Sequence, residues 1–415
     1  MPATVLRLTT DTPVAAPLGD DVLRGPAPTS AAATRQAVLA ALAAPVEFPA
    51  LELSLTPDDH VAIALDGSTP GAETIVDTLV ERLVDYGIGP KRIAVVTDDP
   101  RAAQRLREAE EDRGVIVETH DPSDEEQLCF AGLTKAERTL RVNRTLFEAD
   151  VVLPITTEHP GDHAEDGPFD GLFPRFFDRE TIDRMTRVRT LTSARARGGD
   201  YASARRNETD EAGWMLGAAI QTRVIPGRDG AAETVVFGEA RAVYRDAHAT
   251  AKRVWQSAAP DPAPLVIARL DGDATTQTWS DLARALATAD QLVASDGAVV
   301  LWTDFDQPIG PALSQLGDCD NYDHAASELA EETGDEALFA WRLAQALERG
   351  PVFWRSRLPR TTIDDLGVGV LEDESQLLRL AERFGTCILL EQPQHVRLDA
   401  SDPGDGLNLP EEDVE

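Results

Sequence analysis

Hydrophobic and polar residues follow a regular order between residues 58 and 98. The run HVAIALD (60–66) is almost entirely apolar and ends in a turn-rich segment, DGSTPG (66–71). Beyond it, apolar residues recur at helical spacing, at Ile75, Val76, Leu79, Val80, Leu83 and Val84. A second apolar run, RIAVVTD (92–98), follows a Gly- and Pro-containing helix terminator at 87–90. A strand, a helix and a strand in this order predict a βαβ unit within a parallel sheet.

The next apolar segments are less regular. GVIVETHD (114–121) is typical of a strand and turn, and TLRVNRTLFEAD (139–150) of a strand that runs into a short helix. VVLPI (151–155) predicts another buried strand. Residues 156–214 are rich in Gly, Asp, His and Arg and show little periodicity. Long segments of this kind in compact proteins are commonly functional, so we expect 156–214 to be an irregular, ligand-facing loop region.

The last third of the chain again alternates strand and helix patterns. Strands are predicted at 264–271, 297–304, 351–356 and 386–392, and helices at 279–294, 337–350 and 375–385. The predicted fold class is therefore α/β, with two lobes that each contain a mainly parallel sheet flanked by helices, and a ligand cleft between them. The predicted domains are 1–255 and 256–400, joined near 240–262, followed by an acidic mobile tail at 401–415.

The charge of the chain excludes some partners. Its 73 acidic residues against 39 basic ones give a net charge of −34, and only Lys91, Lys135 and Lys252 are lysines. Such a chain repels phosphate backbones, so we expect neither nucleic-acid nor anionic-membrane partners. Two explanations for the acidity stay open, adaptation to a salty medium and the amino-acid bias of a GC-rich genome.

Other features of the composition favour a cytoplasmic protein. No apolar run approaches the roughly 18 residues of a membrane span, and the first thirty residues lack the pattern of a secretory signal. The three cysteines, Cys129, Cys319 and Cys387, lie far apart, which excludes a disulfide framework and a thiolate zinc site.

Candidate chemistry centres on a few histidines. The common phosphate-loop, dinucleotide, hydrolase-elbow and zinc-protease motifs are absent. His120 follows a predicted strand next to Asp121, a position suited to an oriented general base or, alternatively, to a turn contact. His159 and His163 lie beyond the 151–155 strand, but Pro160 and Gly161 argue against a helical metal site. The other histidines, His60, His248, His324 and His395, are interpreted as surface or capping residues.

Two sets of residues are candidates for anion binding. The turn after the first buried strand contains Asp66, Ser68 and Thr69 and leads into a helix, whose N-terminal amides can cradle an anion. Arginines are frequent further on, at Arg175, Arg184, Arg187, Arg189, Arg195 and Arg197. These arginines are suited to bind a carboxylate or a phosphate. The alternative is that they form a solvated basic face that balances the acidic surface.

Taken in order, several segments resemble the nickel-pincer lactate racemase family, from about residue 21 to residue 394. The opening segments DDVLRGPAPTSAAATRQAVLAAL (20–42) and DDHVAIALDGSTPGAETIVDTLVERLVDYGI (58–88) are similar to the start of that family. THDPSDEEQLCFAGLT (119–134) resembles its His-Asp segment, and VNRTLFEADVVLPI (142–155) its Asn-Arg…Glu-Ala-Asp strand. LFPRFFDRETI (172–182) and ARALATADQLVASDGAVVL (283–301) are similar to two later segments.

The resemblance implies a divergent site. Asp170 takes the place of the family's cofactor-anchoring lysine, Thr186 that of a nickel-binding histidine, and Thr69 that of a turn arginine. Asp98 and Asp99 replace a His-Arg pair, and Arg284 replaces the lysine of the second lobe. Asp66, Pro70 and His120 are retained, together with either His159 or His163 as the second proton-transferring histidine.

These replacements predict that the nickel-pincer nucleotide is not bound. A carboxylate cannot form the link that the family's lysine makes, and a threonine hydroxyl is a poor nickel ligand beside imidazole. We therefore expect no metal and no cofactor, with His120, His159, His163 and Arg284 as candidate catalytic residues. The candidate ligand-binding residues are Asp66, Ser68, Thr69, Asp170 and Thr186.

Three hypotheses about function stay open. The first is a divergent relative that binds a small molecule, such as a 2-hydroxy acid, in the interlobe cleft without nickel. The second is an active 2-hydroxy-acid racemase or epimerase, an isomerase that carries the nickel-pincer nucleotide. The third is a non-catalytic relative that acts as an interaction or scaffold protein. The sequence predicts no oligomeric state.

Overall fold

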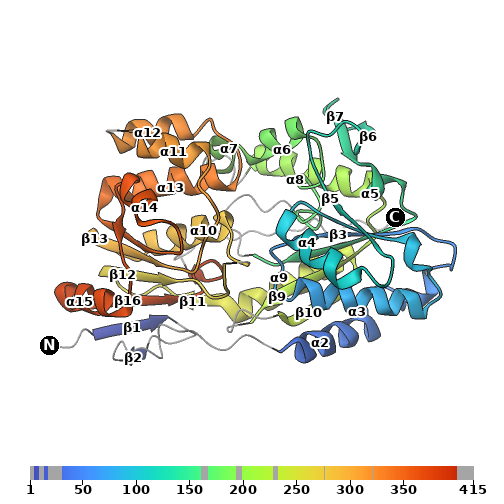
Figure 1. Cartoon of the computed structure of the whole chain (residues 1–415), viewed down its shortest axis with the longest axis horizontal. Helices are drawn as coiled ribbons and strands as arrows, with labels where there is room; N and C mark the ends of the chain where they lie inside the picture. The colour runs from blue at the N-terminus through green and yellow to red at the C-terminus, as the bar shows by residue number, and fades with distance from the viewer. Residues whose placement is uncertain are drawn as a thin grey trace.

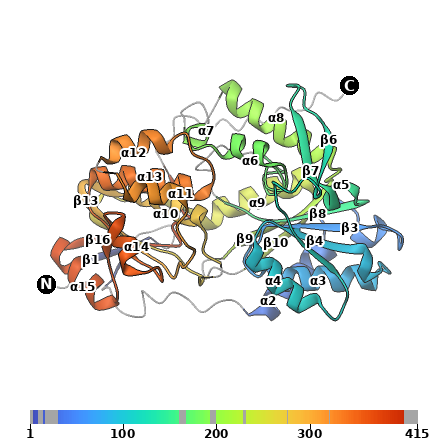
Figure 2. The ribbon, with the colours of Figure 1, turned by 45° about the horizontal axis from the view of Figure 1, so that its top comes forward.

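The computed structural model describes residues 4–8, 14–16, 30–159, 167–192, 199–227, 232–274, 276–319 and 321–399. Within them, most strands belong to two large sheets, one in each half of the elongated molecule (Figure 1). Helices flank both sheets, as the view turned by 45° also shows (Figure 2). The predicted α/β fold class with two mainly parallel sheets is confirmed.

The first sheet has the strand order β10-β9-β8-β3-β4-β5 among the described residues. Its strands are β3 (Val61–Leu65), β4 (Ile93–Thr97), β5 (Ile116–Thr119), β8 (Val151–Thr157), β9 (Ile220–Pro226) and β10 (Ala232–Glu239). All neighbours pair in parallel except β9 and β10. Every residue of β3 is buried, because Ile63 and its alternate neighbours face one hydrophobic core while Ala62 and Ala64 face another.

Helices cover the two faces of this first sheet. α2 (Ala31–Ala43) and α3 (Ala72–Asp85) pack on one face, as the shared core of Val38, Ile75 and Ile63 shows. The segment 167–178 and helix α5 (Arg144–Glu148) pack on the other face, through Phe173 and Leu146. The helix-terminating signal at residues 87–90 is confirmed, since α3 ends at Asp85 and Gly87 has a left-handed φ of 99°.

The second sheet has the order β15-β14-β13-β12-β16-β1-β2 among the described residues. Its strands are β1 (Thr4–Leu8), β2 (Val14–Ala16), β12 (Ala263–Arg269), β13 (Val293–Trp302), β14 (Val352–Arg355), β15 (Gly369–Val370) and β16 (Thr386–Glu391). β1 runs parallel to β16, so the first strand of the chain extends the sheet of the second lobe. The expected domain boundary at residue 255 assigns β1 to the first domain, whereas β1 pairs with β16 in the second sheet.

Residues 156–214 were expected to be an irregular loop region, and this expectation is wrong for most of the described part. The segment contains α6 (Arg179–Thr186), α7 (Val188–Thr192) and α8 (Gly199–Met215). The apolar residues that these helices bury, among them Met185 and Val188, are interleaved with charged residues that form ion pairs. Glu208 of α8, for example, is buried against Arg138 and Arg184. Residues 160–166, which include His163, and residues 193–198 lie outside the described residues.

The remaining described helices and strands complete the two lobes. In the first half they are β6 (Leu128–Leu133), β7 (Thr139–Asn143), α4 (Pro100–Glu110) and the short 3-10 turns η1 (Leu51–Leu53) and η2 (Pro90–Arg92). In the second half they are α10 (Trp279–Asp290), α11 (Pro311–Gly317), α12 (Tyr322–Leu329), α13 (Asp335–Arg349), α14 (Arg360–Asp365) and α15 (Glu374–Phe384). Among the described residues, no helix is long and apolar enough to cross a bilayer.

Several elements tie the lobes together. α9 (Ala240–Trp255) runs from the first lobe into β11 (Gln256–Ala258), which pairs with β17 (Arg397–Asp399). Val188 of α7 is buried in the core of the second lobe, and Arg101 of α4 forms an ion pair with Asp306 at 2.8 Å. The stacking of His159, which follows β8, on His395, which follows β16, shows that carboxyl ends of the two sheets meet. Ligands of open α/β sheets bind at such strand ends.

Candidate functional site

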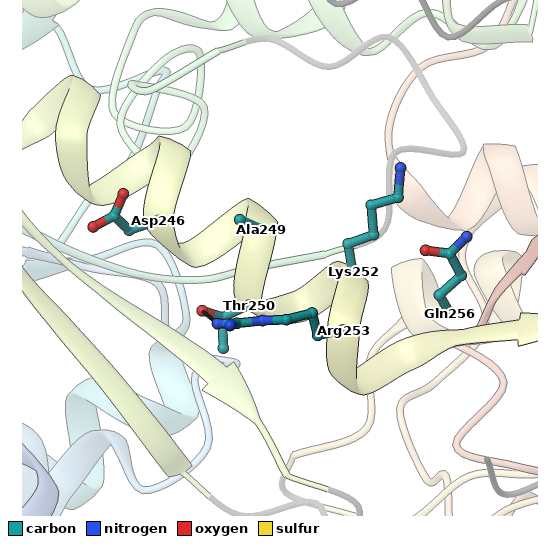
Figure 3. A pocket seen from close by; sticks show the side chains of 6 residues that line it. All are labelled: Asp246, Ala249, Thr250, Lys252, Arg253 and Gln256. Carbon is teal, nitrogen blue, oxygen red and sulfur yellow. Dashed lines mark hydrogen bonds between the residues drawn. The ribbon is translucent and has the colours of Figure 1, made fainter. Parts of the chain in front are cut away.

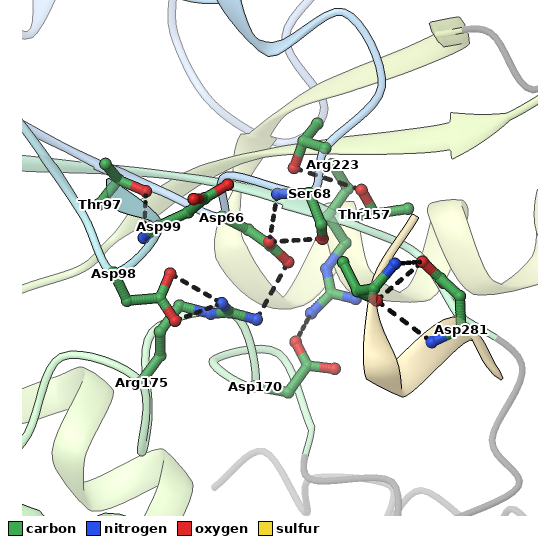
Figure 4. A network of polar contacts seen from close by, with 12 residues as sticks. Asp66, Ser68, Thr97, Asp98, Asp99, Thr157, Asp170, Arg175, Arg223 and Asp281 are labelled. Atoms are coloured by element: carbon green, nitrogen blue, oxygen red, sulfur yellow. Dashed lines mark hydrogen bonds and ion pairs between the residues drawn. The ribbon is translucent and has the colours of Figure 1, made fainter. Parts of the chain in front are cut away.

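The carboxyl ends of β3 and β4 hold an arginine between two carboxylates (Figure 4). Asp66 follows β3 and Asp98 follows β4, whereas Arg175 comes from the 167–178 segment. The two terminal nitrogens of Arg175 donate to Asp98, at 2.7 and 2.9 Å from one nitrogen, and to Asp66 at 3.2 Å. The parallel pairing of β3 and β4 brings the two aspartates to one edge of the sheet. This ion-pair group is one half of the candidate site.

The turn after β3 uses its own polar groups to fix Asp66. The Ser68 amide and hydroxyl donate to the Asp66 carboxylate at 3.0 and 2.7 Å. The Thr69 amide donates to the Asp66 carbonyl, and the Ala72 amide to the Thr69 carbonyl. The Thr157 hydroxyl lies 3.3 Å from that of Thr69. Because these amides are already bonded within the loop, they do not form an open cradle for an anion.

A second arginine is held in the same way on β9. Arg223 is buried and forms ion pairs with Glu158, after β8, and with Asp170. Figure 4 shows the contact with Asp170. The Arg223 guanidinium also lies 4.8 Å from the centre of the Tyr244 ring. Asp170, which the sequence resemblance is expected to put at the place of a cofactor-anchoring lysine, is engaged by a buried cation. Sequence reasoning missed Arg223, although an arginine inside an apolar strand signals a buried ion pair.

The electrostatics of this group reflect burial and opposite charges. Burial raises the pKa of Asp98 above its usual value, and the charge of Asp66 adds to the effect, while Arg175 opposes it. Burial works against the charge on Arg175, but the carboxylates of Asp66 and Asp98 outweigh it and raise its pKa. Burial likewise opposes the charge on Arg223, and Asp170 and Glu158 raise its pKa. Both guanidinium groups thus stay charged and are neutralised by the chain itself.

The other half of the candidate site is a pair of imidazoles from the two lobes. The rings of His159 and His395 are nearly parallel, with 5.8 Å between their centres and 9° between their planes. The indole of Trp255 also packs against His395, with 5.2 Å between the ring centres. Burial, together with the charge of Arg284, lowers the pKa of His395 to about 3 and that of His159 well below its usual value. Both imidazoles are therefore neutral at ordinary pH.

Arg284 lies on α10 beside these imidazoles. It forms an ion pair with Asp281, one turn earlier on the same helix, at 3.4 Å. Asp281 itself caps α10, because its carboxylate accepts from the amide and hydroxyl of Thr278. Burial raises the pKa of Asp281, and the charge of Asp66 in the first lobe adds to it. The two halves of the site thus act on each other across the lobes.

His120 is placed differently. It is buried after β5, and its Nε2 donates to the Phe177 carbonyl at 3.0 Å while its Nδ1 accepts from Asn143 at 3.4 Å. Burial lowers its pKa, so the ring is neutral. Both ring nitrogens are engaged by the chain, an arrangement that orients the 177–178 turn. A catalytic role for His120 stays a prediction.

Two other predicted residues, Thr186 and His163, are not among those that the contacts above bring together. The Thr186 hydroxyl donates to the Ile182 carbonyl of its own helix, and the Thr186 carbonyl accepts from Gly334. His163 lies outside the described residues. His395 and His248, interpreted as surface or capping residues, are buried or half-buried, and that interpretation is wrong for them. Glu158 accepts from His248 at 3.2 Å.

The surface hollow in Figure 3 lies elsewhere. It is lined by residues of α9 and the start of β11, namely Asp246, Ala249, Thr250, Lys252, Arg253 and Gln256. It is open, and no histidine lines it. In the part of the chain that the structure describes, no three His, Cys, Asp or Glu side chains are arranged to hold a metal ion.

Comparison with solved structures places this architecture among known folds. The lactate racemase apoprotein from Thermoanaerobacterium thermosaccharolyticum is similar with a TM-score of 0.69 and 13% sequence identity, over 96% of this chain and 100% of that one. A protein from Thermotoga maritima is similar with a TM-score of 0.61 and 13% identity, over 90% and 99% of the two chains. No family model and no curated protein matches the sequence. The fold is therefore lactate-racemase-like.

Proposed function

We propose that this protein binds a small ligand, such as a 2-hydroxy acid, between its lobes and does so without the nickel-pincer nucleotide. The observation that carries the proposal is the meeting of strand ends from both sheets at His159, His395 and Arg284, next to Arg175 and its two aspartates. The likeness in fold to a lactate racemase apoprotein is a supporting argument for an acid of this class.

The residues at the site do not fit the nickel-pincer nucleotide. Its attachment needs a lysine amine, but Asp170 stands at that place and is paired with Arg223. Lys135, the nearest lysine in sequence, lies on a turn with a side chain 92% exposed, beside Glu211. The guanidinium groups that would face the phosphate, those of Arg175 and Arg223, are each held between two carboxylates. A phosphate there would lie against uncompensated negative charge.

The arrangement supports binding of one carboxylate rather than of a larger anion. Arg284 has a longer ion pair than Arg175, since its distance to Asp281 is 3.4 Å against 2.7 Å between Arg175 and Asp98. A carboxylate can form a two-point contact with a guanidinium of this kind. Proton transfer at the ligand would fall to His159, whose neutral ring can accept a proton. The reaction class of this proton transfer is isomerisation.

The decisive experiment measures binding and metal together. The protein is purified from cells that make the nickel-pincer nucleotide, and nickel is determined by elemental analysis alongside the intact mass. We expect no stoichiometric nickel and no mass increment. Calorimetry with L-lactate, D-lactate and 2-hydroxybutyrate should then give saturable binding that Arg284→Gln weakens at least about tenfold. Arg241→Gln, an exposed arginine of α9, is the matched control.

Two outcomes would contradict the proposal. Stoichiometric nickel with a cofactor-sized mass would favour an active racemase, the function named for the structural neighbour from Thermoanaerobacterium thermosaccharolyticum. Absence of saturable binding for every 2-hydroxy acid tested, with the protein folded, would favour the non-catalytic interaction protein.

A further inference from the structure

The His395 side chain is buried in a way that packing alone does not explain. Only 6% of the residue is exposed, and its Nδ1 has no hydrogen-bond partner among the described residues. The Nδ1 of His159, on the facing ring, is also buried without a described partner. A buried polar nitrogen without a partner costs about 1–3 kcal/mol. Two of them, face to face at one place, indicate a polar site rather than an apolar contact between the lobes.

The position of His395 is fixed by the surrounding chain. Its amide donates to the Gln392 carbonyl at 2.9 Å, and the Thr288 hydroxyl of α10 donates to the neighbouring Pro393 carbonyl at 2.9 Å. The indole of Trp255 packs against its ring and is itself held, since the indole nitrogen donates to the Pro226 carbonyl at 3.0 Å. The ring is therefore oriented before any ligand arrives, which lowers the entropic cost of binding.

The charge at this place favours an anionic group. The Thr288 hydroxyl of α10 contacts both the Arg284 carbonyl, at 3.1 Å, and the Pro393 carbonyl, at 2.9 Å, so α10 brings Arg284 close to the segment that carries His395. The charge of Arg284 accordingly lowers the pKa of both imidazoles. Its described ion pair is the long one with Asp281, so much of its guanidinium can donate to a ligand. A neutral imidazole offers one N–H, and His159 and His395 offer theirs from opposite lobes. Two N–H groups and a guanidinium are a set of donors that a carboxylate satisfies.

We infer that His395 is a second ligand-contacting imidazole, and that His159, His395 and Arg284 together hold one carboxylate of the ligand between the two lobes. This inference rests on the proposed ligand binding and adds to it a residue of the second lobe. His395 is then a specificity-determining residue, because a neutral ester or amide cannot accept the full set of donors. A ligand held from both sides also bridges the strand ends of β8 and β16.

The test compares a substitution of the buried His395 ring with the same substitution of an exposed histidine. His395→Phe keeps a flat ring between His159 and Trp255 and removes both ring nitrogens. We expect an unchanged melting temperature and lactate affinity at least about tenfold weaker by calorimetry. His324→Phe, at a position on α12 where the side chain is 68% exposed, is the matched control and should leave the affinity within about twofold.

Proton NMR supplies a second readout, in which the shifts are measured on the unmodified protein and variants serve only to assign the signals. Histidine C2–H signals are followed during titration with sodium lactate and with sodium acetate, at constant ionic strength set by sodium chloride. His159→Gln and His395→Gln assign the two signals, and we expect both to shift with either acid and neither with methyl lactate.

The outcomes separate this inference from the proposed function. Lactate binding that His395→Phe leaves within twofold, with unshifted His395 signals, overturns the inference and leaves the proposed function standing. Absence of any lactate or acetate binding overturns both. If the melting temperature of His395→Phe falls, the NMR titration of the unmodified protein decides instead. Unshifted His159 and His395 signals in that titration overturn the inference.

Discussion

At the scale of single residues, two arginines that are each paired with two carboxylates organise the site. Arg223 is 1% exposed and lies between Glu158 and Asp170, and Arg175 lies between Asp66 and Asp98. Each arginine is the cation that allows two carboxylates to stay ionised inside the protein. The same pairing makes these arginines poor partners for an added anion, so ligand recognition is left to Arg284 and the imidazoles.

Replacing Arg223 is expected to be strongly destabilising. In Arg223→Met the carboxylates of Glu158 and Asp170 lose their shared cation, and a broken buried pair of this kind costs about 3–5 kcal/mol in free energy of unfolding. Arg223→Lys should be intermediate, because an ammonium keeps the charge but not the planar fork. Urea denaturation followed by circular dichroism measures both.

The control for this prediction is Arg241→Met. Arg241 is 68% exposed and pairs with Asp210 at 3.2 Å, so its loss should cost about 0–1 kcal/mol. Equal losses in free energy of unfolding for Arg223→Met and Arg241→Met would show that the ion pairs of Arg223 do not stabilise the fold.

At the scale of elements, the fit of the 167–178 segment against β8 places Arg175 and Asp170. Gly171 lies against Thr156 of β8 so closely that a Cβ at this position would overlap the threonine side chain. Both residues of the segment that form ion pairs, Asp170 and Arg175, flank this contact. The close approach of backbone to strand therefore sets the position of the ion-pair group as well as the packing of Phe173.

Gly171→Ala is expected to push the segment away from β8. Overpacking in a tight contact costs about 1–3 kcal/mol in free energy of unfolding. Thermal unfolding measures this loss. Gly89→Ala is the matched control, since no atom lies within 4 Å of a Cβ added there. Equal stability of the two variants would contradict the close fit.

At the scale of the whole molecule, the net charge of −34 dominates. Many arginines are paired with acids at the surface, for example Arg35 with Asp77 and Arg360 with Glu372, but acids outnumber bases by 34. Mutual repulsion of the excess carboxylates disfavours the compact state in dilute buffer.

Added salt is expected to stabilise the protein. Near 1 M the Debye length falls to roughly 3 Å, so repulsion between the carboxylates is screened. We expect the melting temperature to rise between dilute buffer and about 1–2 M KCl, measured by calorimetry. A sucrose series separates general exclusion effects from screening. A flat or falling melting temperature in KCl would remove the explanation by adaptation to salt.

Most strands and helices of this fold follow from local sequence. HVAIALD, RIAVVTD and VVLPI are apolar runs short enough to be strands and are buried as β3, β4 and β8. The helix predicted from Ile75 onward and the strand-to-helix segment 139–150 are found as α3 and as β7 with α5. These elements were predictable because the period of burial along a strand or helix is set by backbone geometry.

Long-range packing decided the rest. β1 pairs with β16 from the far end of the chain, the ion pair of Arg184 with Glu208 joins α6 to α8, and Val188 of α7 is buried in the core of the second lobe. The sequence marked Asp66, His159 and Arg284 as candidates, but the partnership of Arg223 with Asp170 and the approach of His395 to His159 are tertiary facts. Residues 236 positions apart in the sequence meet only because two sheets present their carboxyl ends to each other, and no local pattern encodes that meeting.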